Sequence, residues 1–433
     1  MPGADDTGAE GERLTAQVET FRLQGRYGEM LALADGALKT FPHMGEACLA
    51  RGEALRGLGL LDAALEAYGE AAAAAPRMTF DAHFGRALVL DDLGRVDEAL
   101  DAFEAALALR PDAPLPRFGR ALLRLYRRDF AAGWDDYEAR WRSEVFIDGC
   151  RGLVPPGMVA HLATGVTPAD LAGRRVLVVG EQGIGDQLMF ASMIPDLARL
   201  AASVVCVCEP RLVRLLAASF DNVTVADPNI GNVEADIAVA MGSLGGAFRR
   251  HAADFPGAAY LRPTPEVRAR WAELLGPRRA RLRVGISWRG GTPATGQQAR
   301  SLQLQQLAPV LGAPDCEFVN LQYGDVRQEI AAENAGRIDP IRLFPSADID
   351  DLEDLAGLVA NLDAVVSVQT SLVHLTGALG QTGIALLPHR ANWRYTERGD
   401  TMPWYRSVRL IRQAEPGAWD PVVAQAAAAL ESL

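Results

Sequence analysis

The sequence predicts an all-helical repeat region followed by an α/β body that consists of two lobes with parallel sheets. Three observations support this order. Glycines and prolines recur at a fixed spacing through the first part of the chain, and the recurrence ends near Phe146. Apolar, strand-like runs then alternate with helical segments in two successive sets. A chain of 433 residues is also too long for one ordinary core, so we expect about three domains.

The recurrence has the period of a tetratricopeptide (TPR) helix pair. Gly25, Gly59 and Gly94 are separated by 34 and 35 residues, and a proline follows each glycine at the same offset. After a loose tail over residues 1–10, the period predicts four helix pairs within residues 11–146, at 11–44, 45–78, 79–112 and 113–146. Such repeats stack into a groove that binds another protein.

The fourth helix pair differs from the other three. Trp134, Tyr137 and Trp141 fall on one helical face. Because a terminal repeat must cover the last exposed core, we interpret this face as a cap against the next domain. Residues 147–174 contain Pro155, Pro156 and several glycines, which predicts a linker or docking arm.

Two sets of strands and helices follow the linker. We expect the first lobe at 175–270, the second lobe at 271–415 and a C-terminal helix at 416–433. The strands predicted in the first lobe are 175–180, 203–208, 223–226 and 237–240, with helices at 186–200 and 211–219. In the second lobe they are 283–288, 317–321, 364–368 and 384–387, with helices at 350–361 and 371–379. A cleft between two such lobes is the expected ligand site.

The net charge and the cysteine content limit the partners and the cellular compartment that we expect for this protein. A net charge of −12 argues against a nucleic-acid partner, because most of the surface would repel phosphates. The five cysteines are scattered and odd in number, which indicates a reducing compartment. Cys206 and Cys208 alternate in an apolar run and are interpreted as buried strand residues, with a metal pair as the alternative. The sequence has no apolar run of transmembrane length and no signal-type segment near residue 1, so we expect a cytoplasmic protein.

The first candidate site is the glycine loop at 180–185, where a predicted strand runs into a helix. Glycines here allow close backbone approach, which suits a phosphate or an acceptor group. Asp186 follows the loop and has two interpretations. It is either the N-cap of the helix or a general base toward a hydroxyl. A helix N-terminus keeps a carboxylate ionised, so a base here would accept its proton late in the reaction.

The second candidate site lies where the strand at 364–368 ends. Thr370 and Ser371 open a helix whose amides can bind an anion, and His374 lies one turn further on. His374 is either a residue that reaches the same anion or a sugar, or a core histidine. Arg300, after a glycine-rich loop, is either a cation beside this site or an ordinary surface arginine.

These segments, in this order, resemble the TPR-fused, heptosyltransferase-like glycosyltransferases of bacteria, and the resemblance covers nearly the whole chain. The segments that carry it are 129–141, 181–186, 285–288, 300–302, 321–322, 370–374, 393–394 and 404–405. The resemblance implies a GT-B fold, with the acceptor on the first lobe and a nucleotide-sugar on the second. It also implies an inverting direct displacement that needs neither a metal nor a cofactor.

The resemblance assigns roles to individual residues. It implies that Asp186 is the catalytic base, that His374 is a second catalytic residue and that Arg300 meets the donor phosphates. The other residues implied to bind substrates are Gln182, Gly183, Gly185, Trp288, Ser301, Gln322, Gln369, Thr370, Ser371 and Trp393. Asp348, Asp350 and Asp351 resemble the metal-binding carboxylates of another glycosyltransferase class, but their place before a helix favours N-capping.

One position departs from the family pattern. The family commonly has Asp before the threonine of the helix start, and this chain has Gln369. Some enzymes of this type transfer nonulosonic acids from a CMP-linked donor to Ser or Thr hydroxyls of flagellin. Because a neutral amide tolerates a sugar carboxylate better than Asp does, the resemblance makes such a donor, with flagellin bound by the repeats as acceptor, an attractive hypothesis.

Two other interpretations stay open. The neutral Gln369 is compatible with an inactive adaptor, in which the repeats bind a partner and the α/β part is only a scaffold. Glu209 ends the second predicted strand, where a dinucleotide fold keeps its ribose-binding acid, so an NAD-dependent oxidoreductase is the other alternative. The glycine spacing at 180–185 does not match the dinucleotide fingerprint, which weakens this interpretation.

Overall fold

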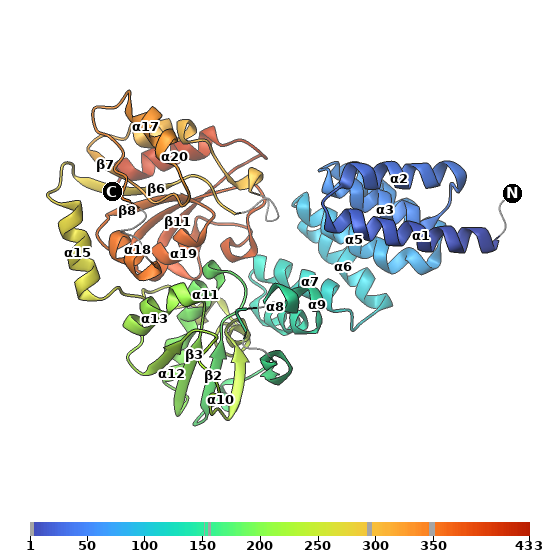
Figure 1. The fold of residues 1–433 in the computed structure, drawn as a ribbon, viewed down its shortest axis with the longest axis horizontal. Coiled ribbons are helices and arrows are strands. Elements are labelled where there is room, and N and C mark those ends of the chain that lie inside the picture. Colours follow the sequence, from blue (N-terminus) through green and yellow to red (C-terminus); the bar gives the residue numbers. More distant parts are fainter. Residues whose placement is uncertain (1–3, 151, 155–156, 292–296, 346–350) are drawn as a thin grey trace. The chain divides into compact units, whose positions relative to one another are not determined.

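The computed structural model describes residues 4–150, 152–154, 157–291, 297–345 and 351–433 (Figure 1). The chain forms two compact units, Met1–Arg124 and Leu125–Leu433, whose boundary falls within helix α7 (Pro114–Tyr126). The predicted end of the repeats at residue 146 therefore differs from the boundary between the units. The second half of the fourth helix pair belongs to the α/β unit.

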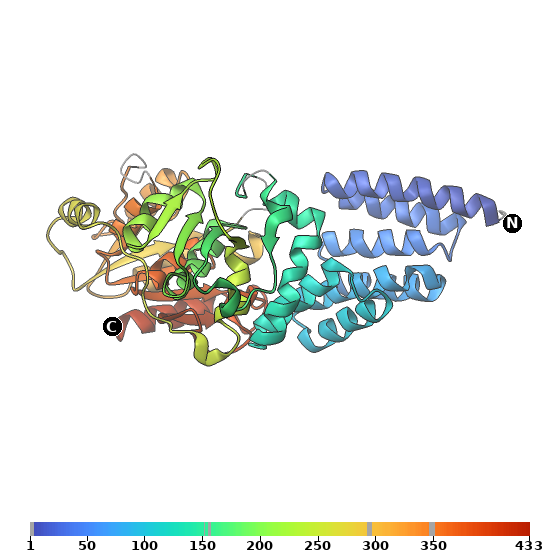
Figure 2. The same ribbon diagram turned by 90° about the horizontal axis from the view of Figure 1, so that it is seen from below.

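The first unit consists of antiparallel helix pairs (Figure 2). Its helices are α1 (Ala4–Leu23), α2 (Tyr27–Thr40), α3 (Gly45–Gly57), α4 (Leu61–Ala74), α5 (Thr79–Asp92) and α6 (Val96–Leu109). Gly25, Gly59 and Gly94 turn the chain between the helices of each pair, with φ of 66°, 77° and 73°. Since α1 already begins at Ala4, the prediction of a loose tail over 1–10 is wrong from residue 4 onward.

Small residues let neighbouring helices of the repeats approach. A Cβ atom on Gly85 of α5 would lie 2.3 Å from the ring of Tyr68 in α4, and one on Gly52 of α3 would lie 2.9 Å from the same ring. Tyr68 therefore fills space that only glycine leaves open on both neighbouring helices. Both glycines lie inside helices, where glycine is otherwise unfavourable.

The second unit begins with the predicted aromatic face. Trp134 lies in α8 (Phe130–Tyr137) and is 1% exposed. Its ring packs so closely on α14 (Leu244–Phe248) that a Cβ on Gly245 would lie 2.6 Å from it. The short helices η2 (Glu138–Arg142) and α9 (Glu144–Gly149) continue the segment. As the sequence predicts, this segment is buried against the first lobe, where Trp141 joins a cluster that includes Leu177 of the sheet.

The first lobe has a five-stranded parallel sheet in the order β1-β5-β2-β3-β4. Its strands are β1 (Leu162–Ala163), β2 (Arg175–Val179), β3 (Ser203–Val207), β4 (Val223–Ala226) and β5 (Ile237–Ala240). Its other helices are α10 (Pro168–Leu171), α11 (Ile184–Phe190), α12 (Ile194–Ala198) and α13 (Val213–Ser219). The predicted linker at 147–174 thus supplies the edge strand β1. The predicted helix at 186–200 is split by a 3₁₀ turn, Ala191–Met193, before Pro195.

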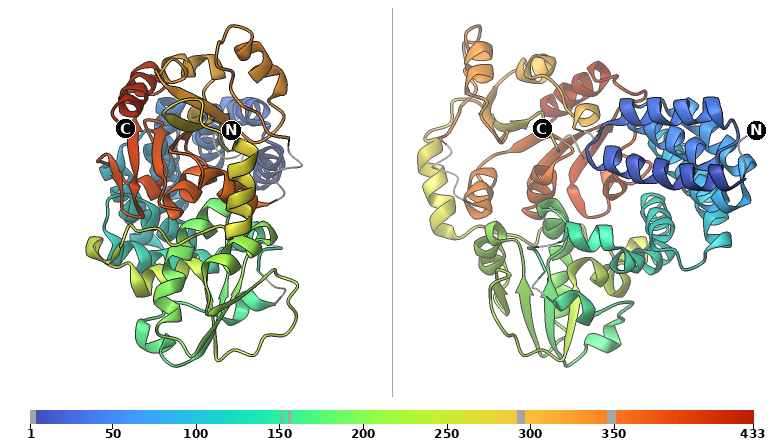
Figure 3. Two further views of the ribbon diagram at one scale, coloured as in Figure 1. Left: turned by 90° about the vertical axis from the view of Figure 1, so that its left-hand side faces the viewer. Right: turned by 45° about the vertical axis from the view of Figure 1, so that its right-hand side comes forward.

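The second lobe has a six-stranded sheet in the order β10-β11-β9-β8-β6-β7, in which only β10 is antiparallel (Figure 3). Its strands are β6 (Leu282–Ser287), β7 (Cys316–Asn320), β8 (Ala364–Val368), β9 (Thr382–Leu387), β10 (Thr401–Met402) and β11 (Tyr405–Arg412). Its helices are α15 (Pro265–Leu275), α16 (Ala308–Leu311), α17 (Arg327–Asn334), α18 (Leu352–Val359), α19 (Ser371–Ala378) and α20 (Asp420–Glu431). Helical repeats followed by two parallel-sheet lobes confirm the predicted fold class.

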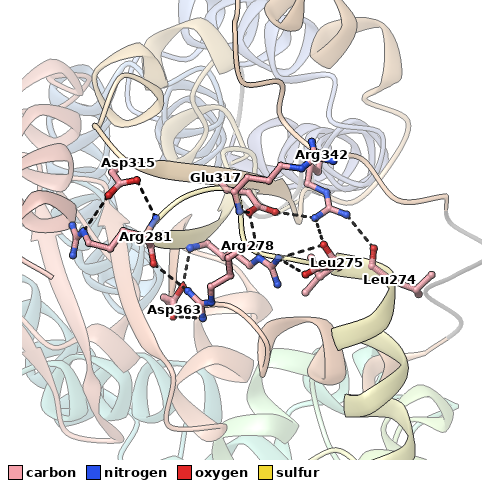
Figure 4. Close-up of polar contacts among 11 residues, drawn as sticks. Leu274, Leu275, Arg278, Arg281, Asp315, Glu317, Arg342 and Asp363 are labelled. Atoms are coloured by element: carbon pink, nitrogen blue, oxygen red, sulfur yellow. Dashed lines mark hydrogen bonds and ion pairs between the residues drawn. The ribbon is translucent and has the colours of Figure 1, made fainter.

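A cluster of ion pairs ties α15 to the sheet near the starts of β6 and β7 (Figure 4). The Glu317 carboxylate accepts hydrogen bonds from Arg283 at 3.3 Å and from Arg342 at 2.8 Å. Both arginines also donate to the carbonyl of Leu275 at the end of α15. The cluster therefore satisfies carbonyls that the helix end leaves without a partner.

We expect Glu317→Gln to lower the free energy of unfolding by about 3 kcal/mol, because it removes the anion from a pair in which Arg283 and Glu317 are each 5% exposed. Burial raises the pKa of Glu317, but the hydrogen bonds from its arginines outweigh burial and hold the pKa below its ordinary 4.5. The stabilisation is thus complete above the ordinary pKa and is lost as the pH falls through the lowered one. Urea unfolding at several pH values checks this.

Asp315→Asn is the matched control for that experiment. Asp315 belongs to the same cluster, but its side chain is 61% exposed and its ion pair with Arg281 is 4.0 Å long. We expect a change below about 1 kcal/mol. Equal losses for the two variants, or a Glu317 effect that grows toward acid pH, would show that the buried pair does not stabilise the lobe.

Candidate active site

The loop between β2 and α11 places Asp186 in the first turn of a helix. Gly183 is the N-cap of α11, and Asp186 is the third helical residue, so the prediction of Asp186 as the N-cap is wrong. The helix begins at Ile184, two residues before the predicted start. The Asp186 Oδ2 atom accepts a hydrogen bond from the Gly183 amide at 3.3 Å and thereby closes the first turn.

A buried ion pair between Arg140 and Glu181 fixes the loop between β2 and α11. Glu181 follows β2, and its carboxylate accepts two hydrogen bonds from Arg140, at 2.8 and 2.7 Å. Both side chains are 0% exposed. Glu181 also accepts from the Gly242 amide at 2.7 Å, and Ser243 accepts from Arg140 at 2.9 Å. The segment from the repeats to the first lobe thus fixes the start of the loop that carries Asp186.

The second lobe contributes the start of α19. Thr370 is the N-cap of this helix and accepts a hydrogen bond from the Leu372 amide at 3.2 Å. The Oε1 atom of Gln369 accepts from the Asn392 amide at 3.0 Å. Gln369 therefore ties the end of β8 to the segment after β9. A carboxylate could accept the same bond, so the structure gives Gln369 a structural contact without showing why Asp is replaced.

These two helix starts face one cavity of about 560 Å³ between the lobes. The first lobe lines it with Ile184, Gly185, Asp186 and Arg211. The second lobe lines it with Gly291, Arg300, Tyr323, Gln369, Thr370, Ser371, His374, Asn392, Arg394 and Tyr395. The cavity lies at the carboxyl ends of β2 and β8, which is where parallel α/β sheets bind ligands.

Gly185 lets the two helices meet. A Cβ atom on Gly185 would lie 3.3 Å from the Cδ2 atom of His374 and 3.4 Å from the Cα atom of Ser371. These separations are tighter than ordinary van der Waals contacts, so a larger residue would push α11 away from α19. Asp186 and His374 therefore line the same cavity, as the predicted site requires.

Asp186 is held by an arginine from the opposite lobe. The Arg394 guanidinium donates a hydrogen bond to the Oδ1 atom of Asp186 and another, of 2.5 Å, to Asn392. The side chains of Arg394 and Asp186 are 14% and 13% exposed. Burial lowers the pKa of Arg394, but the charge of Asp186, its hydrogen bond and two nearby tyrosines together outweigh burial and raise this pKa above its ordinary value. Each oxygen of Asp186 thus accepts one hydrogen bond from the protein, one from its own loop and one from the second lobe.

The cavity is electropositive. Arg211, Arg300 and Arg394 line it, whereas Asp186 is the one acid among its lining residues in the described part of the chain. Burial lowers the pKa of Arg300, which still leaves a guanidinium charged at neutral pH. The arginine packs so closely on the loop that a Cβ on Gly291 would lie 1.9 Å from its Nη2 atom. The lining thus holds more arginines than acids, which favours an anionic ligand, although Arg211 and Arg394 are each paired with a carboxylate, Glu209 and Asp186.

His374 combines the two interpretations that the sequence left open. It is 4% exposed and packs against Tyr395 and Tyr405, as a core histidine would, yet it also lines the cavity. Burial, and after it the charge of Arg394, lower its pKa to about 3. The ring is therefore neutral at neutral pH and brings no positive charge to an anion.

Three residues with a predicted binding role lie behind the cavity. Trp288 is in the core of the second lobe and donates through its ring nitrogen to Glu329 at 3.0 Å. Gln322 is buried and accepts from the Trp288 and Arg289 amides at 2.9 and 2.7 Å. Ser301 accepts from the Gly290 amide at 3.2 Å. Because their polar groups satisfy the loop after β6, these residues shape the cavity wall instead of lining it.

Three further residues also lie outside the cavity lining. Trp393 packs edge-on against Trp134 and Tyr137, with ring centroids 5.8 and 6.1 Å apart. The Gln182 amide donates to the Tyr137 hydroxyl, and Gly183 is occupied as the N-cap of α11. Trp393 thus packs against the aromatic residues of the segment that precedes the first lobe. Gln182 and Gly183 position Asp186 through the backbone of the loop.

Seven residues that line the cavity were not among the predicted site residues. These are Ile184, Arg211, Gly291, Tyr323, Asn392, Arg394 and Tyr395. Arg394 and Tyr395 belong to one 3₁₀ turn with Trp393, in which adjacent side chains point in different directions. The polar residues around this turn could have indicated a binding site from the sequence. Only the structure of the turn shows that Arg394, and not Trp393, faces Asp186.

Other expectations concern residues away from the cavity. Glu209 follows β3 and accepts from Arg211 at 2.8 Å, and it is not among the residues that line the cavity. Asp351 is the N-cap of α18, as predicted, whereas Asp348 and Asp350 lie outside the described residues.

Cys206 and Cys208 are buried, and neither forms a disulfide bond. Within the described ranges, no cluster of three or more His, Cys, Asp or Glu could hold a metal ion, and no helix is long and apolar enough to cross a membrane.

Comparison with known proteins supports the division of the chain. A tetratricopeptide-repeat family profile matches residues 15–79 and 49–114. The chain is 32% identical over 384 residues to Protein FlbA of Caulobacter vibrioides, in an alignment that covers 81% of this chain and 61% of FlbA. The chain therefore spans less than two thirds of the length of this curated relative.

Two solved structures resemble 60% of the chain. One is a glycosyl transferase of family 9 from Veillonella parvula, with 12% identity and a TM-score of 0.43 over 92% of its length. The other is the ADP-heptose lps heptosyltransferase II of E. coli, with 15% identity and a TM-score of 0.42 over 100% of its length. The chain is thus similar in sequence to FlbA, and in it tetratricopeptide repeats precede a body of two parallel-sheet lobes.

Proposed function

We propose that the protein is a glycosyltransferase that moves a sugar from a nucleotide-sugar to a hydroxyl group, in an inverting reaction without a metal or cofactor. The observation that carries the proposal is the cavity between the lobes, which is lined by the Asp186 carboxylate from one lobe and by the start of α19, Arg300 and Arg394 from the other. A nucleotide-sugar needs a cationic place for its phosphate, and the acceptor hydroxyl needs a nearby base. The resemblance of the sequence to TPR-fused glycosyltransferases supports the same assignment.

The charges suggest an order of events. In the proposed reaction, the donor phosphate binds at the start of α19, beside Arg300, and attracts Arg394 away from Asp186. The freed carboxylate accepts the proton of the acceptor hydroxyl while the oxygen of that hydroxyl forms the new glycosidic bond to the sugar. The bond between the sugar and the phosphate breaks, and the arginines stabilise the departing anion. A positioned base contributes about 10²–10⁴-fold and each preorganised donor roughly 3–4 kcal/mol.

We further propose that the acceptor is a protein bound by the repeats, with Ser or Thr hydroxyls as the modified groups. Covalent attachment of the repeats to the α/β unit would raise the effective concentration of a bound acceptor. Flagellin, modified with a CMP-linked nonulosonic acid, is the specific pair that the sequence resemblance favours. The neutral Gln369 beside the cationic cavity supports a donor sugar that itself carries a carboxylate.

The test is the intact mass of the acceptor. Purified protein is incubated with flagellin and a panel of nucleotide-sugars that includes CMP-linked nonulosonic acids, with EDTA in a parallel sample. The proposal predicts a mass increase of one or more sugar residues, unchanged by EDTA, together with release of the nucleotide. Flagellin that binds the repeats but is never modified, by any donor of the panel, would favour the adaptor interpretation instead.

A further inference from the structure

His374 and two tyrosines behind it, Tyr405 and Tyr260, form a chain of hydrogen bonds that runs from one lobe to the other. The Tyr260 hydroxyl, in the segment between the lobes, donates to the carbonyl of Leu188 in α11 at 2.7 Å. The Tyr260 and Tyr405 hydroxyls are 3.2 Å apart, and the Tyr405 hydroxyl is 3.3 Å from the Nδ1 atom of His374.

The direction of each bond follows from the first one. A carbonyl can only accept, so the single proton of Tyr260 points to Leu188. Tyr405 must then donate its own proton to Tyr260. Because Tyr405 has no second proton, the bond to His374 exists only if Nδ1 is the donor. Burial raises the pKa of both tyrosines above their ordinary value, so neither hydroxyl loses its proton near neutral pH.

The packing around this chain is specific. A Cβ on Gly377, in the helix that carries His374, would lie 2.2 Å from the ring of Tyr405. Only glycine lets the tyrosine ring come this close to α19. The backbone amide of Tyr260 also donates to the Ala378 carbonyl at 2.9 Å, which fixes the segment between the lobes against the end of the same helix.

We infer that Tyr260 and Tyr405 are positioning residues that hold His374 as its Nδ1–H tautomer, so that its Nε2 atom is an acceptor for a hydroxyl group of the ligand. Nε2 lies on the ring edge away from Tyr405, next to the Cδ2 atom that approaches the cavity-lining Gly185. An unprotonated nitrogen repels a phosphate oxygen and accepts a hydrogen bond from a hydroxyl. The identity of that hydroxyl as one of the donor sugar rests on the proposed function, whereas the tautomer does not.

The experiment is nitrogen NMR of the protein labelled at histidine, in the absence of nucleotide-sugar. His374→Gln identifies the His374 signals among the six histidines. At neutral pH, we expect Nδ1 in the protonated range and Nε2 in the unprotonated range. Tyr260→Phe frees the Tyr405 proton to point at Nδ1, so we expect the His374 tautomer to shift toward Nε2–H, although Tyr260 has no hydrogen bond to His374.

Tyr323→Phe is the control, because Tyr323 lines the same cavity but donates to the Gly291 carbonyl at 3.1 Å. We expect it to keep the wild-type tautomer. Addition of inorganic pyrophosphate should also leave Nε2 unprotonated. An Nε2–H tautomer in the wild type, a Tyr260→Phe spectrum like that of the wild type, or protonation of Nε2 by pyrophosphate would each overturn the inference.

Kinetics separate this inference from the proposed function. If transfer is detected, Tyr260→Phe should raise the KM for the donor by roughly 3- to 10-fold, the effect of one hydrogen bond, with little change in kcat. A changed kcat with an unchanged KM would overturn the assignment to the donor sugar. If the tautomer shifts as expected and no sugar is ever transferred, the hydrogen-bond chain stands and the proposed function fails.

Discussion

Replacing Asp186 by Asn is expected to lower the rate of sugar transfer by about 10²–10⁴-fold, the contribution of a positioned general base. Asn keeps the shape of Asp186, but its single side-chain oxygen can replace only one of the two acceptors that Gly183 and Arg394 use, and it cannot take the hydroxyl proton. Binding of the nucleotide should persist, because the start of α19 and Arg300 are unchanged. Nucleotide release under saturating donor measures the effect.

Asp221→Asn is the matched control for Asp186→Asn. Asp221 also lies in the first lobe and accepts from an arginine, Arg262, but neither of these two residues lines the cavity. We expect this variant to transfer sugar at the wild-type rate. Full activity of Asp186→Asn would remove Asp186 from the mechanism, and an equal loss in both variants would point to a general effect of charge on the first lobe.

The largest loss of stability is expected for Arg140→Met, at about 3–5 kcal/mol. This change leaves the Glu181 carboxylate, 0% exposed, without its cation. A second change, Glu181→Leu, removes the stranded charge, so the double variant should recover most of the loss. Chemical unfolding of the four proteins measures the coupling between the two residues.

Arg250→Met is the control, since its ion pair with Asp135 is exposed, with side chains 39% and 61% accessible. We expect it to cost less than about 1 kcal/mol. If Arg140→Met is no more destabilised than Arg250→Met, or if Glu181→Leu adds to the loss, the buried pair does not hold the loop of Asp186 in place.

The fold was predictable where the signal is local. Gly25, Gly59 and Gly94 each mark the turn inside one helix pair, so their spacing gives the length of the repeat. Each glycine has the positive φ that such a turn requires. Apolar runs likewise reveal buried parallel strands such as β8. In contrast, α15 and β11 were not predicted, because their burial depends on partners that are distant in sequence.

The site was predictable in part for the same reason. Asp186, Thr370 and His374 follow glycine loops or strand ends, which have short-range signatures, and all three line the cavity. Arg394 was missed as a site residue because its pairing with Asp186 joins positions 208 residues apart. Trp288 and Gln322 belong to segments that resemble motifs of the glycosyltransferase family. Only the packing of β6 against β7 shows that their polar groups point into the lobe.

The central claim is that the cavity between the lobes binds the phosphate of a nucleotide. Calorimetric titration of the wild type and of Arg300→Ala with CMP, UDP, GDP and ADP tests it most directly. We predict that one of these nucleotides binds the wild type and that Arg300→Ala weakens this binding by about 10- to 100-fold, as expected for the loss of a hydrogen bond from a charged group. Absence of binding by all four nucleotides, or binding that Arg300→Ala leaves unchanged, would contradict the account.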